Sequence, residues 1–191
     1  MLKSAELGRV LSKQEYEATV AELRTSLLKV QAELEHAKFP VVVLLHGADG
    51  AGKSQTLNTL NEWFDARFLR TEAYERPNER ERERPEFWRY WMWQPRAGQI
   101  ALFLGSWYTR PILDRVLNGG KERHLAASLS RINAFERTLA DNGTLFISCG
   151  FTSVRKSRSN GWKPRLERRA RASWLPSATG VTTVTTTNSW R

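Results

Sequence analysis

The apolar positions near the start of the chain recur at alternating steps of four and three residues. Ser12 and Glu15 have the S-x-x-E spacing of a capping box, which predicts that a helix begins directly after Ser12. One stripe of apolar residues then follows along that helix: Tyr16, Val20, Leu23, Leu27, Val30 and Leu34. Such a stripe suits docking on the domain or on another helix, and we expect this long amphipathic helix to pack on its own core.

Short apolar runs separated by helical patterns follow this helix. They predict strands at four places: Pro40–Leu45, Phe68–Tyr74, Gln99–Leu104 and Thr144–Ile147. The clearest helical pattern lies before the last strand and ends at Asp141-Asn142-Gly143; its apolar positions are Leu125, Leu129, Ile132, Phe135 and Leu139. Alternating strands and helices need crossover connections. The pattern therefore predicts an α/β fold with a parallel sheet and helices on both faces.

The junction between the first predicted strand and the next helix carries the strongest chemical motif. Residues Gly47–Ser54 read G-x-x-x-x-G-K-S, a phosphate-binding loop in its strand–loop–helix context, which makes the fold P-loop kinase-like. Backbone N–H groups of such a loop point at phosphate oxygens, and the helix dipole adds positive potential. We expect phosphate or nucleotide binding by Gly47, Ala48, Asp49, Gly50, Ala51, Gly52, Lys53 and Ser54. Lys53 would reach the terminal phosphates, and the Ser54 hydroxyl would ligate Mg²⁺.

A highly charged stretch, Arg76–Arg89, lies between the second and third predicted strands. Glu and Arg alternate along it, which indicates a solvated and partly helical element. One interpretation is a salt-bridged surface helix. The other is a mobile lid whose arginines, Arg76, Arg80, Arg84 and Arg89, close over a polyanion. The aromatic run Tyr90-Trp91-Met92-Trp93 is expected to anchor this element rather than to bind a base.

The charge and composition of the chain limit the classes of partner and the location that we expect. The chain has 191 residues and a formal net charge of +10, but Cys149–Arg191 holds nine Lys/Arg and one acid and so carries +8 of it. The remainder is nearly neutral, so we expect no specific nucleic-acid binding. A single cysteine excludes an internal disulfide. We expect no membrane span and a cytoplasmic location, because no apolar run is long enough to cross a bilayer and the N-terminus lacks a signal core.

Three stretches together resemble the polyphosphate kinase type 2 family. They are Phe39-Pro40-Val41 leading into Gly47–Ser54, the segment from Arg76-Pro77 to Trp88-Arg89, and Ser106-Trp107-Tyr108-Thr109-Arg110, which is similar to the family's S-W-Y-N-R. The similarity covers roughly Ser4 to Phe146, and it is greatest to the N-terminal half of two-domain polyphosphate:AMP phosphotransferases.

The resemblance implies phosphoryl transfer between inorganic polyphosphate and a nucleotide, AMP or ADP, with Mg²⁺ as cofactor. It implies catalytic roles for Asp49 and Lys53, a Mg²⁺ site at Asp49 and Ser54, and a polyphosphate-binding role for Arg110 beside the lid arginines. It also implies a homo-oligomer or a second, catalytic domain as partner.

The chain departs from the family pattern directly before the S-W-Y element. Active members carry D-R there, and the resemblance assigns that Asp to Mg²⁺; this sequence has Leu104-Gly105. A leucine side chain cannot ligate Mg²⁺, which takes oxygen ligands. Three functions therefore stay open: a phosphotransferase, a catalytically impaired phosphate-binding half-domain with a structural or regulatory role, and an unrelated P-loop nucleotide kinase.

The sequence changes character after Ile147, where periodicity and acidic residues disappear. We expect residues 1–147 to form an incomplete P-loop domain and residues 148–191 to be an unstructured basic tail, so that the C-terminal part of the fold is truncated or disordered. With plausible codons, inserting one nucleotide after Ile147 yields K-L-W-F-H-L-S, which resembles the family's continuation. We interpret the tail as a frameshift product; the alternative is a lineage-specific basic extension.

Overall fold

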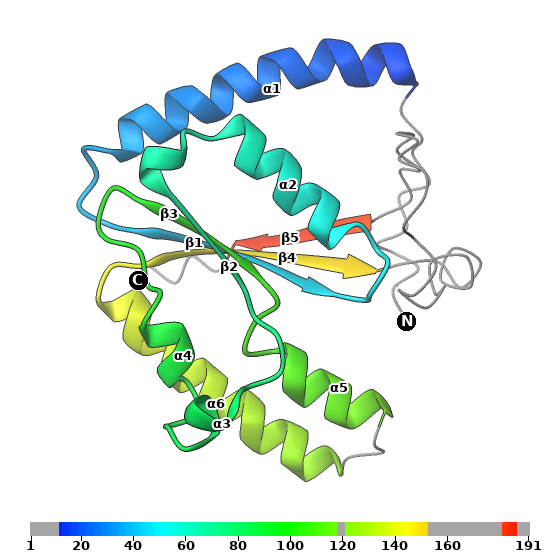
Figure 1. The fold of residues 1–191 in the computed structure, drawn as a ribbon, viewed down its shortest axis with the longest axis vertical. Helices are drawn as coiled ribbons and strands as arrows, with labels where there is room; N and C mark the ends of the chain where they lie inside the picture. The colour runs from blue at the N-terminus through cyan, green and yellow to red at the C-terminus, as the bar shows by residue number, and fades with distance from the viewer. Residues whose placement is uncertain (1–11, 118–120, 153–180, 187–191) are drawn as a thin grey trace.

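Five strands form one sheet in the order β2-β3-β1-β4-β5 (Figure 1). The computed structural model describes residues 12–117, 121–152 and 181–186. Strands β1 (Val41–Gly47), β2 (Leu69–Ala73), β3 (Ile100–Leu104) and β4 (Leu145–Thr152) are parallel, and β5 (Val181–Thr186) pairs antiparallel with β4. The predicted α/β fold with a parallel sheet is confirmed. Each predicted strand is present with ends shifted by a few residues.

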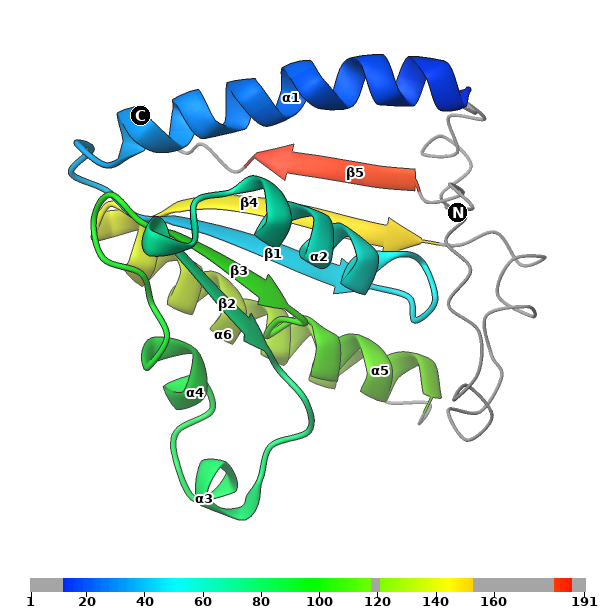
Figure 2. The same cartoon turned by 45° about the horizontal axis from the view of Figure 1, so that its top comes forward.

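Helices cover both faces of the sheet, as Figure 2 shows. Helices α1 (Lys13–Leu34) and α2 (Lys53–Trp63) lie on one side, and α5 (Thr109–Leu117) and α6 (Glu122–Asp141) lie on the other. Side chains alternate between the faces along β1. Val41, Val43 and Leu45 pack in the cluster with α2, whereas Val42 and Leu44 pack in the cluster with α6. The α6 pattern that the sequence predicted supplies Ile132, Phe135 and Leu139 to that second cluster.

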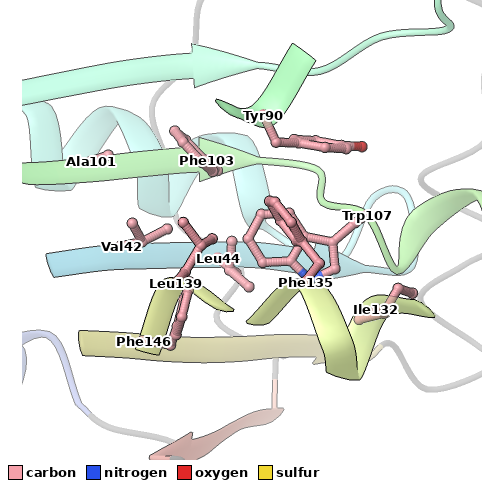
Figure 3. Close-up of a cluster of buried hydrophobic side chains, with 10 residues drawn as sticks. All are labelled: Val42, Leu44, Tyr90, Ala101, Phe103, Trp107, Ile132, Phe135, Leu139 and Phe146. Carbon is pink, nitrogen blue, oxygen red and sulfur yellow. The ribbon is translucent and has the colours of Figure 1, made fainter. Parts of the chain in front are cut away.

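The core on the α6 side is rich in aromatic residues (Figure 3). Trp107 packs edge-on against Phe135, with ring centroids 5.0 Å apart, and against Tyr90 at 5.2 Å. These rings come from α6 and from the two connections that flank β3. The connections, which carry the candidate site, are therefore fixed on a rigid core.

Helix α1 begins with the predicted capping box. The Ser12 side chain accepts a hydrogen bond from the Glu15 N–H, and the Glu15 side chain accepts one from the Ser12 N–H. Its apolar stripe is buried only near the end of the helix. Leu34 is 8% exposed, whereas Leu23 is 48% and Val30 57% exposed. The expectation that the stripe packs on the core is thus correct only at the C-terminal end, where the Gln31 side chain bonds to the backbone of Asp65.

The predicted boundary at residue 147 is wrong, because β4 continues to Thr152. The pairing with β1 extends from Val41↔Leu145 to Gly47↔Phe151, and Phe151 is only 4% exposed. Val181–Thr186 also forms a strand, which pairs antiparallel with β4. Backbone groups of β1 need partners on this side, and they find them in the first residues of the changed segment. The rest of the predicted tail, 153–180 and 187–191, lies outside the described residues. The frameshift interpretation stays a prediction.

In the part of the chain that the structure describes, no helix has both the length and the apolarity needed to cross a membrane.

Candidate phosphate-binding site

Three connections leave the same edge of the sheet, because parallel strands end together there. The loop to α2 follows β1, the charged segment follows β2, and the S-W-Y element follows β3 (Figure 1). Strand β1 leads to α2 on one face, and β3 leads to α5 and α6 on the other, so the chain changes direction between these two strands. Ligands of open α/β sheets bind at such a switch point.

The loop after β1 depends on glycine at particular positions. Gly47 has φ +121°, and a Cβ atom there would lie 2.1 Å from the carbonyl oxygen of Phe151. The next residue, Ala48, donates its N–H to that same oxygen at 2.9 Å. Gly52, with φ +97°, begins α2 from a left-handed conformation. The predicted loop is therefore present between a buried strand and a helix, and β4 supports it from the side.

Lys53 curls back over this loop. Its Nζ donates to the carbonyl oxygens of Gly47 at 2.8 Å and Ala48 at 2.7 Å, and it lies 3.1 Å from Asp49 Oδ1. The Lys53 side chain is 14% exposed, whereas that of Asp49 is 87% exposed. Ser54 follows, exposed, in the first turn of α2. A lysine in this position places positive charge where the loop amides and the helix N-terminus also favour an anion.

The donors near the loop suit Mg²⁺ only in company with phosphate. Asp49 and Ser54 offer one carboxylate and one hydroxyl, which fits an ion that keeps several waters and takes other ligands from substrate phosphates. Within the described residues, no three His, Cys, Asp or Glu side chains cluster as a metal site. Leu104 ends β3 half-buried, and its backbone oxygen already accepts a bond from Tyr74 N–H at 2.9 Å. The predicted Mg²⁺ role of Asp49 and Ser54 stays a prediction.

The S-W-Y element lies between β3 and α6. Ser106 and Trp107 are buried, and Trp107 Nε1 donates to Glu136 Oε1 at 2.8 Å. Burial and the Glu136 carboxylate raise the pKa of Tyr108, which keeps its phenol protonated. Glu136 was not predicted from the sequence, because nothing in its spacing distinguishes it from a solvated helix acid.

His46 connects the loop strand to β4. Its Nε2 lies 2.9 Å from the hydroxyl oxygen of Ser148, and its ring lies 5.7 Å from that of Tyr108. Burial, together with the positive charge of Lys53, lowers the pKa of His46 below its ordinary value. The imidazole is thus held neutral next to the lysine. The sequence alone gave no reason to separate it from an ordinary strand-end residue.

The charged segment is helical in part, with α3 at Glu79–Arg82 and α4 at Trp88–Trp91. Arg89 faces inward. Its Nη1 donates to the backbone oxygen of Glu75 at 2.8 Å, its Nε lies 3.4 Å from Glu81 Oε1, and its guanidinium lies 5.0 Å from the centre of the Tyr74 ring. These contacts give Arg89 a structural role in anchoring the segment. Tyr90 is buried beside it, whereas Trp91, Met92 and Trp93 are exposed, so the anchoring role expected of this aromatic run is supported at Tyr90 only.

An open cleft of about 480 Å³ lies between this segment and helices α5 and α6. Five arginines line it: Arg82, Arg84, Arg89, Arg110 and Arg131. The structure therefore brings the predicted residues Arg84, Arg89 and Arg110 together, whereas Arg76 and Arg80 are exposed and do not line the cleft. Arg131 was not predicted, because it lies on α6 and only the fold brings it to the cleft.

Comparison with known proteins identifies relatives of this fold and site. The family model described as Polyphosphate kinase 2 (PPK2) matches residues 10–173. A polyphosphate:AMP phosphotransferase of Pseudomonas aeruginosa is 39% identical over 175 residues, which are 91% of this chain and 35% of that protein. A GDP-polyphosphate phosphotransferase of Mycobacterium tuberculosis is 33% identical over 78% of this chain and 51% of its own length.

Solved structures agree on the fold. A crystal structure from Pseudomonas aeruginosa PA01, described as a polyphosphate kinase 2, superposes with a TM-score of 0.78 at 39% identity; it covers 86% of this chain and 35% of that one. Polyphosphate kinase 2 from Arthrobacter aurescens TC1 gives 0.75 at 21% identity, which supports the fold alone. The chain spans about a third of the length of the polyphosphate:AMP phosphotransferase it matches.

Proposed function

The chain belongs to the polyphosphate kinase 2 family, and on that premise we propose that it takes part in phosphoryl transfer between inorganic polyphosphate and a nucleotide, AMP or ADP. Membership of this family supports the proposal over the third function that the sequence left open, an unrelated P-loop nucleotide kinase. The observation that carries the proposal is the loop Gly47–Ser54 with Lys53 folded over it at the switch point of the sheet.

The loop suits this reaction because phosphoryl transfer depends mainly on placement and charge. Amides of the loop hold phosphate oxygens, and Lys53 exchanges its carbonyl partners for the terminal phosphate. The acceptor is itself a phosphate and is largely ionised at pH 7, so the site needs no general base. Mg²⁺, when bound, supplies further charge neutralisation, and Asp49 and Ser54 are the residues that would hold it. Arginines of the cleft would bind further phosphates of the anionic chain.

Replacement of the loop lysine tests the phosphate site. We expect Lys53→Ala to lose most affinity for ADP and for polyphosphate, measured by isothermal titration calorimetry, while the circular dichroism spectrum stays unchanged. Lys29→Ala, which removes an exposed lysine from α1, is the matched control for net charge. Equal affinity in Lys53→Ala and Lys29→Ala would contradict the site assignment.

A second candidate function is favoured by Leu104. Its side chain stands at the end of β3 where the family resemblance places a Mg²⁺ carboxylate, and it packs with the apolar cluster on the α2 side. In this alternative the chain binds phosphate but transfers it poorly, and acts as a structural or regulatory half of a longer assembly. Loss of one metal ligand removes several kcal/mol of charge stabilisation in the transition state.

Turnover separates the two candidates. If the chain is the impaired half-domain, its turnover rate for polyphosphate-dependent phosphorylation of AMP or ADP with Mg²⁺ stays well below the order of 1 s⁻¹ that is ordinary for enzymes. In that case Leu104→Asp should raise the turnover rate. Leu104→Asn serves as control, because the asparagine side chain has nearly the same shape as aspartate but lacks its charge. A wild-type turnover on the order of 1 s⁻¹ or faster would exclude the impaired half-domain.

A further inference from the structure

Arg131 on α6 forms an ion pair with the charged segment opposite. Its Nε donates to Glu86 Oε2 at 2.7 Å and its Nη2 donates to Glu86 Oε1 at 3.4 Å, so the guanidinium contacts both carboxylate oxygens. A hydroxyl on the same helix, Ser128 Oγ, accepts a further bond from Nη2 at 3.2 Å. The pair is open to solvent, with side chains 52% and 46% exposed.

The same two residues line the arginine cleft. Arg84 lies there with its guanidinium 5.7 Å from the centre of the Trp88 ring, and Arg110 reaches the cleft from α5. The lining holds five arginines and three acids, Glu81, Glu86 and Asp114, so positive charge is in excess. Glu86 thus pairs with one arginine of a surface whose excess positive charge suits an anion.

The exchange of Glu86 for a phosphate is favourable on physical grounds. A solvent-exposed ion pair contributes only about 0–1 kcal/mol, because water and salt screen it and both side chains lose freedom. Phosphate oxygens accept the same two-pronged bond from a guanidinium as a carboxylate does. A phosphate chain also contacts several cleft arginines at once, which Glu86 cannot do.

We propose that Arg131 is a further phosphate-chain-binding residue of this site, and that Glu86 is an internal competitor which holds Arg131 until a phosphate takes its place. The proposal rests on the proposed function, since it assigns a polyphosphate contact to the same site. The segment stays attached to α6 after the exchange, because Phe87 stacks on Phe135 with ring centroids 4.5 Å apart.

Removing the competitor gives the sharpest test, because it predicts a gain in affinity. We expect Glu86→Gln to bind inorganic polyphosphate of defined length about three- to tenfold more tightly than the wild-type chain. Glu83→Gln makes the same charge change in the same segment, at an exposed residue outside the cleft, and should have a smaller effect. Binding is measured by calorimetry at two salt concentrations, because a general charge effect weakens with salt in both variants alike.

Replacing the arginine completes the cycle. Arg131→Ala should weaken binding about three- to tenfold, Arg131→Lys should recover only part of the loss, and Arg137→Ala, an exposed arginine on the same helix, is the control. In the double variant Glu86→Gln/Arg131→Ala, the gain from Glu86→Gln should vanish. Equal gains in Glu86→Gln and Glu83→Gln, or a gain that survives in the double variant, would overturn the proposal.

The same variants distinguish failure of the Arg131 proposal from failure of the proposed function. If Lys53→Ala loses polyphosphate affinity while the Glu86 and Arg131 variants bind like their controls, the loop assignment stands and Arg131 is only a structural contact. If Lys53→Ala, Glu86→Gln and Arg131→Ala all bind like the wild-type chain, both proposals fail.

Discussion

Single residues at the loop show how close the backbone packing is. Gly47 has no room for a side chain, because a Cβ would meet the backbone of Phe151, whereas a Cβ at Gly52 would have no atom within 4 Å. Both residues have positive φ. We expect Gly47→Ala to lower the free energy of unfolding by about 3 kcal/mol or more, and Gly52→Ala by only about 1–2 kcal/mol from backbone strain. Urea denaturation measures the difference, and equal costs would mean that β4 does not approach the loop as described.

The neutral imidazole of His46 predicts a pH dependence. Burial and Lys53 lower its pKa in the folded state, so the unfolded chain binds more protons and stability increases with pH. The contribution is complete above the ordinary histidine pKa of about 6.5 and is lost as pH falls through the lower folded value. We expect His46→Gln, which can keep a bond to Ser148, to show a smaller loss of urea midpoint between about pH 7.5 and pH 5. Identical losses in both proteins would contradict this account.

At the scale of elements, α1 differs most from its predicted environment. The stripe was visible in the sequence, but how much of it is covered depends on where α2 ends and where the Asp65 turn lies. We expect Leu34→Ala to cost about 2–5 kcal/mol of unfolding free energy, because Leu34 is buried. Leu23→Ala should change it by less than about 0.5 kcal/mol. A Leu23→Ala cost as large as that of Leu34→Ala would show that another surface covers the stripe in solution.

The charged segment shows what sequence patterns can and cannot resolve about an element. Alternating Glu and Arg predicted a solvated, partly helical connection, and that is what forms. The pattern could not rank its arginines, because their roles depend on contacts made across the fold. Arg89 turns toward Tyr74 and Tyr90, whose buried phenol has a pKa raised to about 12. Arg131 joins the cleft from a helix more than forty residues away.

Over the whole molecule, the sequence predicted the parallel sheet, the alternation of strands with helices and the loop, since each follows from local periodicity or a fixed motif. It failed at the end of β4. The change in composition after Ile147 suggested that structure stops there, yet strand pairing is decided by the backbone partners that β1 offers, as well as by the residues that follow. The family match likewise runs to residue 173, beyond the predicted boundary.

Phe151 tests whether the packed structure extends past residue 147. If order stopped at residue 147, its side chain would matter little; in the structure it is buried on the α2 side and its carbonyl supports Ala48 at the loop. We expect Phe151→Ala to cost about 3–5 kcal/mol and to weaken ADP binding, because the cavity loosens the strand beside the loop. Phe146→Ala, a cavity on the opposite face, should cost a similar amount with less effect on ADP affinity. A Phe151→Ala protein with wild-type stability and affinity would restore the boundary at Ile147.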